Sequence, residues 1–315
     1  MTDPARAALR SALATAGTAF AVGACHVPQP FLAVLAAQLT AGIAFSGSGG
    51  FAMRLAASWA GTLLGLGLLT ALPDQTFVSL PAFGILCGFL PRAIARRFGL
   101  AEAILFCMGF CGMFAAGIVY PEAGLVIGAA HAVSLGFAVA LTFLAQQVFS
   151  IAPASAIREA ASGWELGASA VGALVAACAI FPDLAVVATI AALATALTLA
   201  SGTGSITAKL AGGLLGTLVS YVFLIIVSGA GNDVALFLIG LAAVIGGFEW
   251  GAVKRPALSA LFRQAGALFA VAATILPRPE ASVAAPTERL LAVLLGIAVA
   301  AAVHFAVYWK QEHQQ

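Results

Sequence analysis

Charged residues are scarce in this chain. Only 8% of the 315 residues are Asp, Glu, Lys or Arg, whereas 62% are hydrophobic and the mean hydropathy is +1.08. About a quarter of the residues in soluble domains are charged, so this composition excludes a soluble fold and indicates an integral membrane protein. The net charge of +2 is spread over many short loops. We therefore expect the lipid bilayer as a partner, and no nucleic acid.

Sequence motifs of enzymes are also missing. The chain has no P-loop, no G-x-S-x-G, no H-E-x-x-H and no cluster of carboxylates of catalytic type. Its five cysteines form no C-x-x-C pair and have no His at metal-ligand spacing, so we interpret them as small apolar fillers. We expect no catalysis, no metal and no other cofactor.

The apolar runs are long and do not alternate, which predicts transmembrane helices rather than strands. About 20 helical residues cross the roughly 30 Å of hydrocarbon in a bilayer, at 1.5 Å per residue. Prolines such as Pro91 and short polar turns separate runs of about this length, so we predict an all-α polytopic membrane protein with twelve helices. The predicted spans are residues 9–26, 30–47, 52–72, 76–93, 100–120, 122–149, 165–182, 184–201, 207–230, 232–251, 257–277 and 287–309.

A duplicated segment organises these spans. Residues 46–65, SGSGGFAMRLAASWAGTLLG, recur at residues 201–220 as SGTGSITAKLAGGLLGTLVS. Each copy is a Gly/Ser loop, then one cation, then an apolar run that contains G-T-L. The duplication predicts two repeats of six helices, residues 1–150 and 151–315. Because six is even, the repeats enter the membrane in the same sense and should be related by a pseudo-two-fold axis along the membrane normal.

The cations predict the orientation of the chain. All lysines and arginines except Arg278 and Arg289 fall on, or nearest to, the membrane face that holds the N-terminus. Positively charged residues concentrate on the cytoplasmic side of membrane proteins. Both termini are therefore expected in the cytoplasm.

Two cations occupy equivalent places in the two repeats. Arg54 of the first copy corresponds to Lys209 of the second. If the Gly/Ser loops tuck into the protein, their free amides and the helix N-termini that follow would attract an anion, and these two cations would add charge. The alternative is that each side chain extends to the cytoplasmic surface.

Three further polar residues fall within predicted spans. Arg263 lies about seven residues into its span, roughly 10 Å below the interface, and with Gln264 beside it we expect it to hold a substrate carboxylate by paired N–H groups. Extension to the near surface is the alternative. His131 lies deep in its span and is a candidate proton relay or a packing residue, and His304 ranks below it.

Uncharged side chains complete the candidate site. Gln38 and Thr40 provide hydrogen-bonding groups on the second span. Phe106, Phe110 and Phe114 follow one another at intervals of four residues, so they share one helix face and could line a path for an aromatic substrate or pack in the interior. Gly109, Gly112 and Ala116 on the same span indicate a close helix contact.

Several short motifs resemble one known family. They are A-L-R at residues 8–10, Pro followed by an aromatic residue at 30–31, R-L-x(5)-G-T-L-L-G at 54–65, and E-R-L-L-A-V-L-L-G at 288–296. Together with the plan of six plus six helices, they resemble the fusaric-acid-resistance or aromatic acid exporter family of bacterial inner-membrane proteins, which is distantly similar to plant aluminium-activated malate channels. The resemblance implies export of small organic anions such as aromatic carboxylates.

Three functional hypotheses follow. The first is a secondary exporter of small organic anions in a bacterial inner membrane, with a second copy of the chain or a periplasmic adaptor as further partners. The second is a passive organic-anion channel. The third is a membrane scaffold or accessory subunit.

Overall fold

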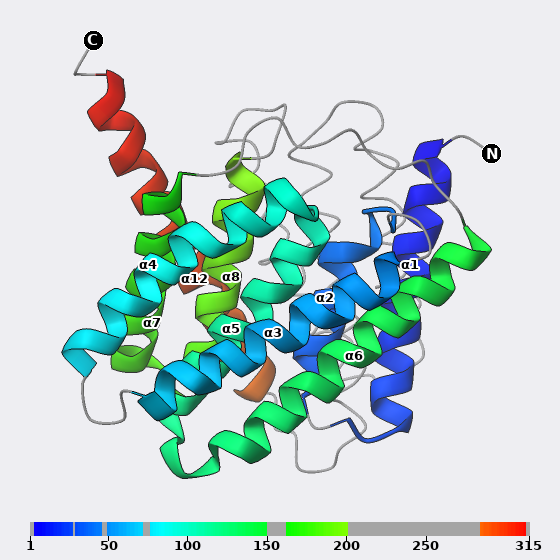
Figure 1. The fold of residues 1–315 in the computed structure, drawn as a ribbon, viewed down its shortest axis with the longest axis horizontal. Coiled ribbons are helices and arrows are strands. Elements are labelled where there is room, and N and C mark those ends of the chain that lie inside the picture. The colour runs from blue at the N-terminus through cyan, green and yellow to red at the C-terminus, as the bar shows by residue number, and fades with distance from the viewer. Residues whose placement is uncertain are drawn as a thin grey trace. The chain divides into compact units, whose positions relative to one another are not determined.

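The structure is a computed structural model of the chain, and Figure 1 shows its fold. It describes residues 3–27, 29–45, 49–71, 76–149, 162–200 and 284–312. Every regular element in these ranges is a helix, and no strand occurs in them. The predicted all-α class therefore holds for the part of the chain that is described.

The described helices match nine of the predicted spans. Their bounds are α1 Asp3–Ala24, α2 Pro30–Ala41, α3 Gly50–Ala71, α4 Thr76–Arg97, α5 Leu100–Val119, α6 Gly124–Val148, α7 Gly163–Ile180, α8 Ala185–Ala200 and α12 Ala284–Glu312, with short 3-10 helices η1 Pro121–Ala123 and η2 Pro182–Leu184. The predicted spans at 207–230, 232–251 and 257–277 lie outside the described residues. The total of twelve helices stays a prediction.

Three predicted boundaries are wrong. The span predicted to begin at residue 9 begins at Asp3. The span predicted at 30–47 is helical only to Ala41, where the chain turns at Gly42. The span predicted to end at residue 93 continues to Arg97, with Pro81 and Pro91 inside the helix. Proline is tolerated within membrane helices because neighbouring groups can satisfy the freed carbonyl. Proline alone was therefore a poor signal for the end of α4.

Five described helices are long and apolar enough to cross a membrane. They are Gly50–Ala71, Val78–Arg97, Leu100–Val119, Gly124–Val148 and Gly163–Ile180. Large apolar side chains are exposed on several of them, including Leu63, Phe89 and Leu125, which are 67%, 63% and 78% exposed. A soluble protein rarely leaves such a surface uncovered. The length of these helices and their exposed apolar side chains are thus both typical of an α-helical membrane protein.

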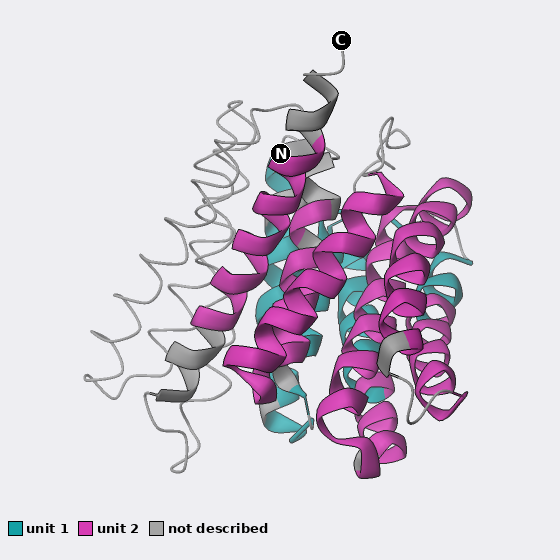
Figure 2. Cartoon of the chain, turned by 90° about the vertical axis from the view of Figure 1, so that its left-hand side faces the viewer, with its two compact units in different colours: residues 1–55, 133–155, 203–290 teal, residues 56–132, 156–202, 291–315 magenta. Residues whose placement is uncertain are grey.

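The chain divides into two compact units (Figure 2). Unit 1 comprises residues 1–55, 133–155 and 203–290, and unit 2 comprises residues 56–132, 156–202 and 291–315. Helices α3, α6 and α12 contribute residues to both units. The predicted repeats at 1–150 and 151–315 were defined by duplication rather than by packing, and they stay a prediction.

Close helix contacts hold unit 2 together. A Cβ atom added to Gly61 on α3 would collide with the carbonyl oxygen of Phe106 on α5, and one added to Gly109 on α5 would collide with the carbonyl oxygen of Ser58 on α3. Glycine lets two membrane helices approach until their backbones touch. The prediction that Gly109 marks a close helix contact is confirmed, and the G-T-L motif places a second glycine at the same crossing.

Two helical hairpins of unit 2 turn in the same way. Helix α5 ends at Tyr120 before η1, and helix α7 ends at Phe181 before η2; the two residues have nearly equal backbone angles, φ −129° and ψ 68° against φ −139° and ψ 69°. Proline follows each aromatic residue and begins the 3-10 helix, where its fixed φ is favourable. The Tyr120 hydroxyl donates a hydrogen bond to Asp183 Oδ1 at 2.7 Å, which joins the turns.

This hydrogen bond predicts a shifted titration of Tyr120. The bond to the Asp183 carboxylate raises the pKa of Tyr120 above its usual value of 10, because it stabilises the protonated phenol. Its contribution to stability is present below the unfolded pKa and is lost as the pH rises through the folded pKa. Tyrosinate absorbance in a Tyr221→Phe/Tyr308→Phe background should show a pKa that Asp183→Asn lowers. An equal pKa in both proteins would contradict the expected result.

Candidate functional site

Two arginine side chains cover the end of helix α2. Arg10 of α1 donates from Nε to the carbonyl oxygen of Ala41 at 2.5 Å. Arg54 of α3 donates from Nη2 to the carbonyl oxygens of Ile43 and Ala44, at 3.0 and 2.8 Å. The last carbonyls of a helix lack donors within the helix and carry the negative end of its dipole. This pairing explains why the chain can leave the helix after Ala41 without losing its buried hydrogen bonds.

Gln146 near the end of α6 links this arrangement together. Its side-chain oxygen Oε1 accepts from Arg10 Nη1 at 2.9 Å and from the backbone N–H of Phe45 at 2.8 Å. The Phe45 ring lies under the Arg54 guanidinium, with 3.7 Å from Cζ to the ring centroid, a cation–π contact. The end of α2 and the chain that follows it are therefore held from three helices, α1, α3 and α6.

Aromatic rings surround the same position. Phe143 contacts Phe45 edge to face, with centroids 5.4 Å apart, and lies 5.2 Å from Phe51. Phe45 is buried, and Phe51 and Phe143 are half-buried. All of these residues belong to unit 1. We call Arg10, Arg54, Gln146 and the three rings the arginine site.

The charges in the arginine site are deeply buried. Arg10 is 0% exposed and Arg54 is 1% exposed, and the two positive charges are close enough to repel each other. Among the described residues, Arg10 Nη2 and the hydroxyls of Ser11 and Thr15 on the same helix have no hydrogen-bond partner. Within the described ranges, no carboxylate forms an ion pair with Arg10. A buried cation is costly without a counter-charge, so the site is suited to receive an anion.

The structure brings only some of the predicted site residues together. Arg54 lies in the arginine site and is buried, so it does not extend to the surface. Gln38 and Thr40 are buried on α2, and the Thr40 hydroxyl donates to the carbonyl oxygen of Ala36 in its own helix at 2.7 Å. Lys209, Arg263 and Gln264 lie outside the described residues. Their proposed roles stay predictions.

The predicted proton relay and aromatic stripe lie in unit 2. His131 is 1% exposed, and its Nδ1 lies 3.1 Å from the carbonyl oxygen of Ile127. Phe106, Phe110 and Phe114 are buried in the packing between α4 and α5, where Phe83 stacks on Phe114 with a centroid distance of 4.3 Å. This position accords with the packing alternative. It does not test their contact with a substrate.

Five residues of the arginine site were missed by the sequence reasoning: Arg10, Gln146 and the three phenylalanines. Arg10 counted only toward the orientation of the chain, and Gln146 was not singled out. The available signal was weak, because Arg10 lies near the start of an apolar run and Gln146 near the end of another. Each could have been a surface residue at a membrane interface.

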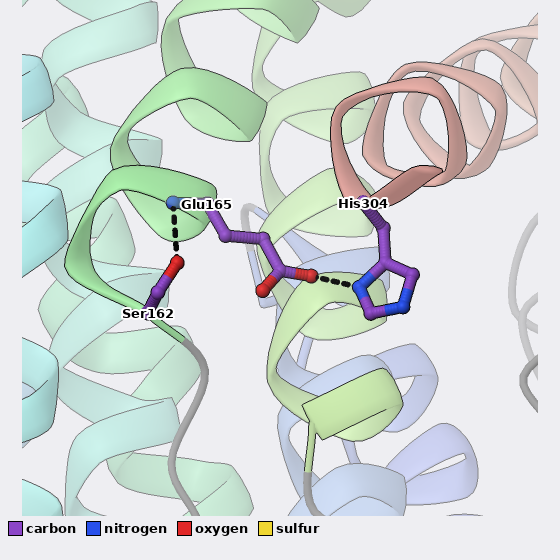
Figure 3. Close-up of polar contacts among 3 residues, drawn as sticks. All are labelled: Ser162, Glu165 and His304. Carbon is purple, nitrogen blue, oxygen red and sulfur yellow. Dashed lines mark hydrogen bonds and ion pairs between the residues drawn. The ribbon is translucent and has the colours of Figure 1, made fainter. Parts of the chain in front are cut away.

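A buried ion pair in unit 2 was also missed. The carboxylate of Glu165 on α7 pairs with Nδ1 of His304 on α12, and the two side chains are 3% and 1% exposed (Figure 3). Ser162 caps α7, because its hydroxyl accepts from the backbone N–H of Glu165 at 3.2 Å. The S-x-x-E pattern at 162–165 could have marked the start of this helix, but not a partner 139 positions away.

Comparison with known proteins assigns no role to the arginine site or to the pair of Glu165 and His304. The family resemblance noted in the sequence thus stays a prediction. The chain matches no protein-family model, no curated protein and no solved structure.

Proposed function

We propose that the chain is a multi-pass transporter that exports small organic anions, aromatic carboxylates in particular, across a bacterial inner membrane. One observation carries the proposal. Arg10 is fully buried in a chain of membrane-protein character, and its Nη2 group has no hydrogen-bond partner in the part of the chain that the structure describes. Intramembrane charges commonly mark the path of a substrate or ion.

The geometry at Arg10 favours a carboxylate. Hydrogen bonds to Ala41 and Gln146 hold two of its three nitrogen atoms, so the planar guanidinium is already oriented and presents the third. A carboxylate there would gain a charge-assisted hydrogen bond and neutralise a buried cation. Arg54 would add attraction from its neighbouring position.

The aromatic rings favour an aromatic substrate over an aliphatic one. Phe45, Phe51 and Phe143 offer faces and edges next to the cations. An aromatic carboxylate could place its ring among them and its charge against an arginine. Ring pairs of this kind are worth about 0.5–1.5 kcal/mol beyond the burial of their area.

The positions of these residues along their helices favour entry of the substrate from the cytoplasm. Arg10 and Arg54 lie near the starts of α1 and α3, and Ala41 and Gln146 lie at or near the ends of α2 and α6. Helices that alternate in direction bring these ends to one membrane face. In the proposed topology, with twelve helices in two parallel repeats and both termini inside, that face is cytoplasmic.

Transport by the wild-type protein is the first test. Inverted vesicles that contain the chain should take up labelled benzoate, and unlabelled aromatic carboxylates should compete better than succinate. Benzylamine, which has the opposite charge, should not compete. Absence of benzoate flux, with or without a proton gradient, would reject the proposal. Unitary anion currents in a planar bilayer would instead identify a passive channel.

Arg10 variants test the site itself. Arg10→Gln should weaken benzoate binding roughly 10- to 150-fold, because it removes a charge-assisted hydrogen bond worth about 1.5–3 kcal/mol. Arg10→Lys should recover only part of the affinity, since lysine keeps the charge and loses the planar fork. Arg6→Gln is the matched control, because Arg6 is exposed on the same helix. Concentration-dependent benzoate uptake measures each affinity.

Folding must be separated from binding in these variants, because Arg10 also covers the end of α2. Protein level in the membrane and a single peak in size-exclusion chromatography establish that each variant is folded. A folded Arg10→Gln protein with benzoate affinity within about twofold of wild type would remove Arg10 from the substrate site while leaving the transport function standing.

A further inference from the structure

We infer that Glu165 and His304 form a proton-binding site that couples anion export to the proton gradient. This inference rests on the proposed transport function. It assigns the coupling ion, which the arginine site alone does not identify. It also places proton binding at a pair of residues different from His131.

The pair is formed by tertiary packing within unit 2. Glu165 is the third residue of α7, and His304 lies in the second half of α12, so the two helices meet at these side chains (Figure 3). The carboxylate oxygen Oε1 faces Nδ1 of the imidazole. Both side chains are almost completely buried. Carboxylate and imidazole are the two side chains most often used to relay protons in membrane transporters.

The pair can change its charge by one proton. A carboxylate next to a neutral imidazole has a net charge of −1. One added proton, bound by the imidazole and shared toward Glu165, makes the net charge zero. Because both side chains are buried, water does not reach the pair in this arrangement. A conformational change that opens the pair to one side of the membrane would therefore release the proton there.

The helices around α7 provide few other charges. Helix α4 packs against α7 where Gly88 meets Gly163, and its nearest charged residue in sequence is the half-buried Arg92. Helix α5 carries the buried Glu102 in its first turn. Helix α8 has no titratable residue between Ala185 and Ala200.

The buried thiols of Cys87 on α4 and of Cys107 and Cys111 on α5 lie within those helices, and the other titratable groups of the described helices around α7 lie toward helix ends. Cys178 and Asp183 lie at the opposite end of α7 from Glu165. On α12 the other charged residues fall near its two ends: Glu288, Arg289, Lys310 and Glu312.

His131 is a weaker candidate for the same role. Its Nδ1 faces the carbonyl oxygen of Ile127 one turn back in its own helix. A carbonyl group cannot take up a proton, so His131 has no titratable partner to share one with in this contact. Glu165 provides that partner for His304.

The test separates anion exchange from proton coupling. Proteoliposomes with unlabelled benzoate on both sides exchange labelled benzoate without net proton movement, and this counterflow reports only anion binding and translocation. A pH gradient across the same membranes drives net benzoate accumulation, which reports coupling. Both reactions are expected for the wild-type protein.

Glu165→Gln is the informative variant. Glutamine keeps the size of the side chain and a hydrogen bond to His304 but cannot ionise. Counterflow should continue within about threefold of wild type, while accumulation driven by the pH gradient should fall to background. His304→Gln should behave alike. Glu122→Gln, which changes an exposed carboxylate in the η1 turn, is the control and should keep both reactions.

Each outcome separates this inference from the proposed function. Absence of counterflow in the wild-type protein would reject transport itself. Normal wild-type counterflow, with gradient-driven accumulation retained in Glu165→Gln, would show that the pair does not couple protons while transport stands. Loss of both reactions in a folded Glu165→Gln protein would also overturn the inference, because the pair would then serve structure or anion binding.

Discussion

Glu165→Leu is expected to lower the free energy of unfolding by about 3–5 kcal/mol, the usual cost of removing one partner from a buried ion pair. The substitution takes the carboxylate away from the buried imidazole of His304. His304→Leu should cost a similar amount, because it leaves the Glu165 carboxylate in the same apolar surroundings. Thermal unfolding of the purified protein in detergent, followed by circular dichroism, measures both.

The double variant distinguishes an interacting pair from two independent residues. Glu165→Leu/His304→Leu should recover most of the lost stability, since well-packed apolar residues often replace a buried ion pair at little cost. Coupling of this kind appears as strong non-additivity in the double-mutant cycle. If the two single effects simply add, the ion pair in Figure 3 does not contribute to folding.

Gly61→Ala is expected to destabilise the protein by about 3 kcal/mol or more, at or above the upper end of the usual cost of overpacking. The added Cβ would meet the carbonyl oxygen of Phe106, and a backbone atom cannot move aside as a flexible side chain can. Gly109→Ala should have a similar effect from the other helix, where the obstacle is the backbone of Ser58. Helices α3 and α5 would have to separate.

Gly67→Ala provides the matched control on α3. A Cβ at Gly67 meets no atom within 4 Å, so alanine should be neutral or slightly stabilising through its helix propensity, worth up to about 1 kcal/mol. Unfolding temperatures of the three variants in one detergent make the comparison. A Gly61→Ala protein as stable as Gly67→Ala would contradict the close crossing of α3 and α5.

Sequence reasoning succeeded where local patterns decide the structure. Long apolar runs without alternation predicted the nine described α-helices, because a chain in lipid must satisfy its backbone hydrogen bonds within each segment. Composition likewise predicted a membrane protein, in agreement with five helices able to cross a bilayer. The close contact at Gly109 could be predicted from small residues within an apolar span.

Local patterns failed where distant residues determine an element. The end of α2 at Ala41 could not be predicted from residues 30–47, because the donor to its last carbonyl comes from Arg10, and the donors to the carbonyls just beyond it come from Arg54, both on other helices. An apolar run has the same local pattern whether or not such donors exist. The run therefore looked longer than the helix.

The arginine site likewise contains one residue that the sequence indicated and others that only tertiary packing brings together. Duplication alone singled out Arg54, since a cation recurs at that point of the repeated segment. Arg10 and Gln146 carry no such signal, and only the packing of α1, α2 and α6 brings their side chains together. The pairing of Glu165 with His304 likewise depends on the meeting of α7 and α12. The sequence by itself determined which segments are helical and apolar; the tertiary structure decided which buried charges face one another, because burial and pairing depend on contacts between residues far apart in the chain.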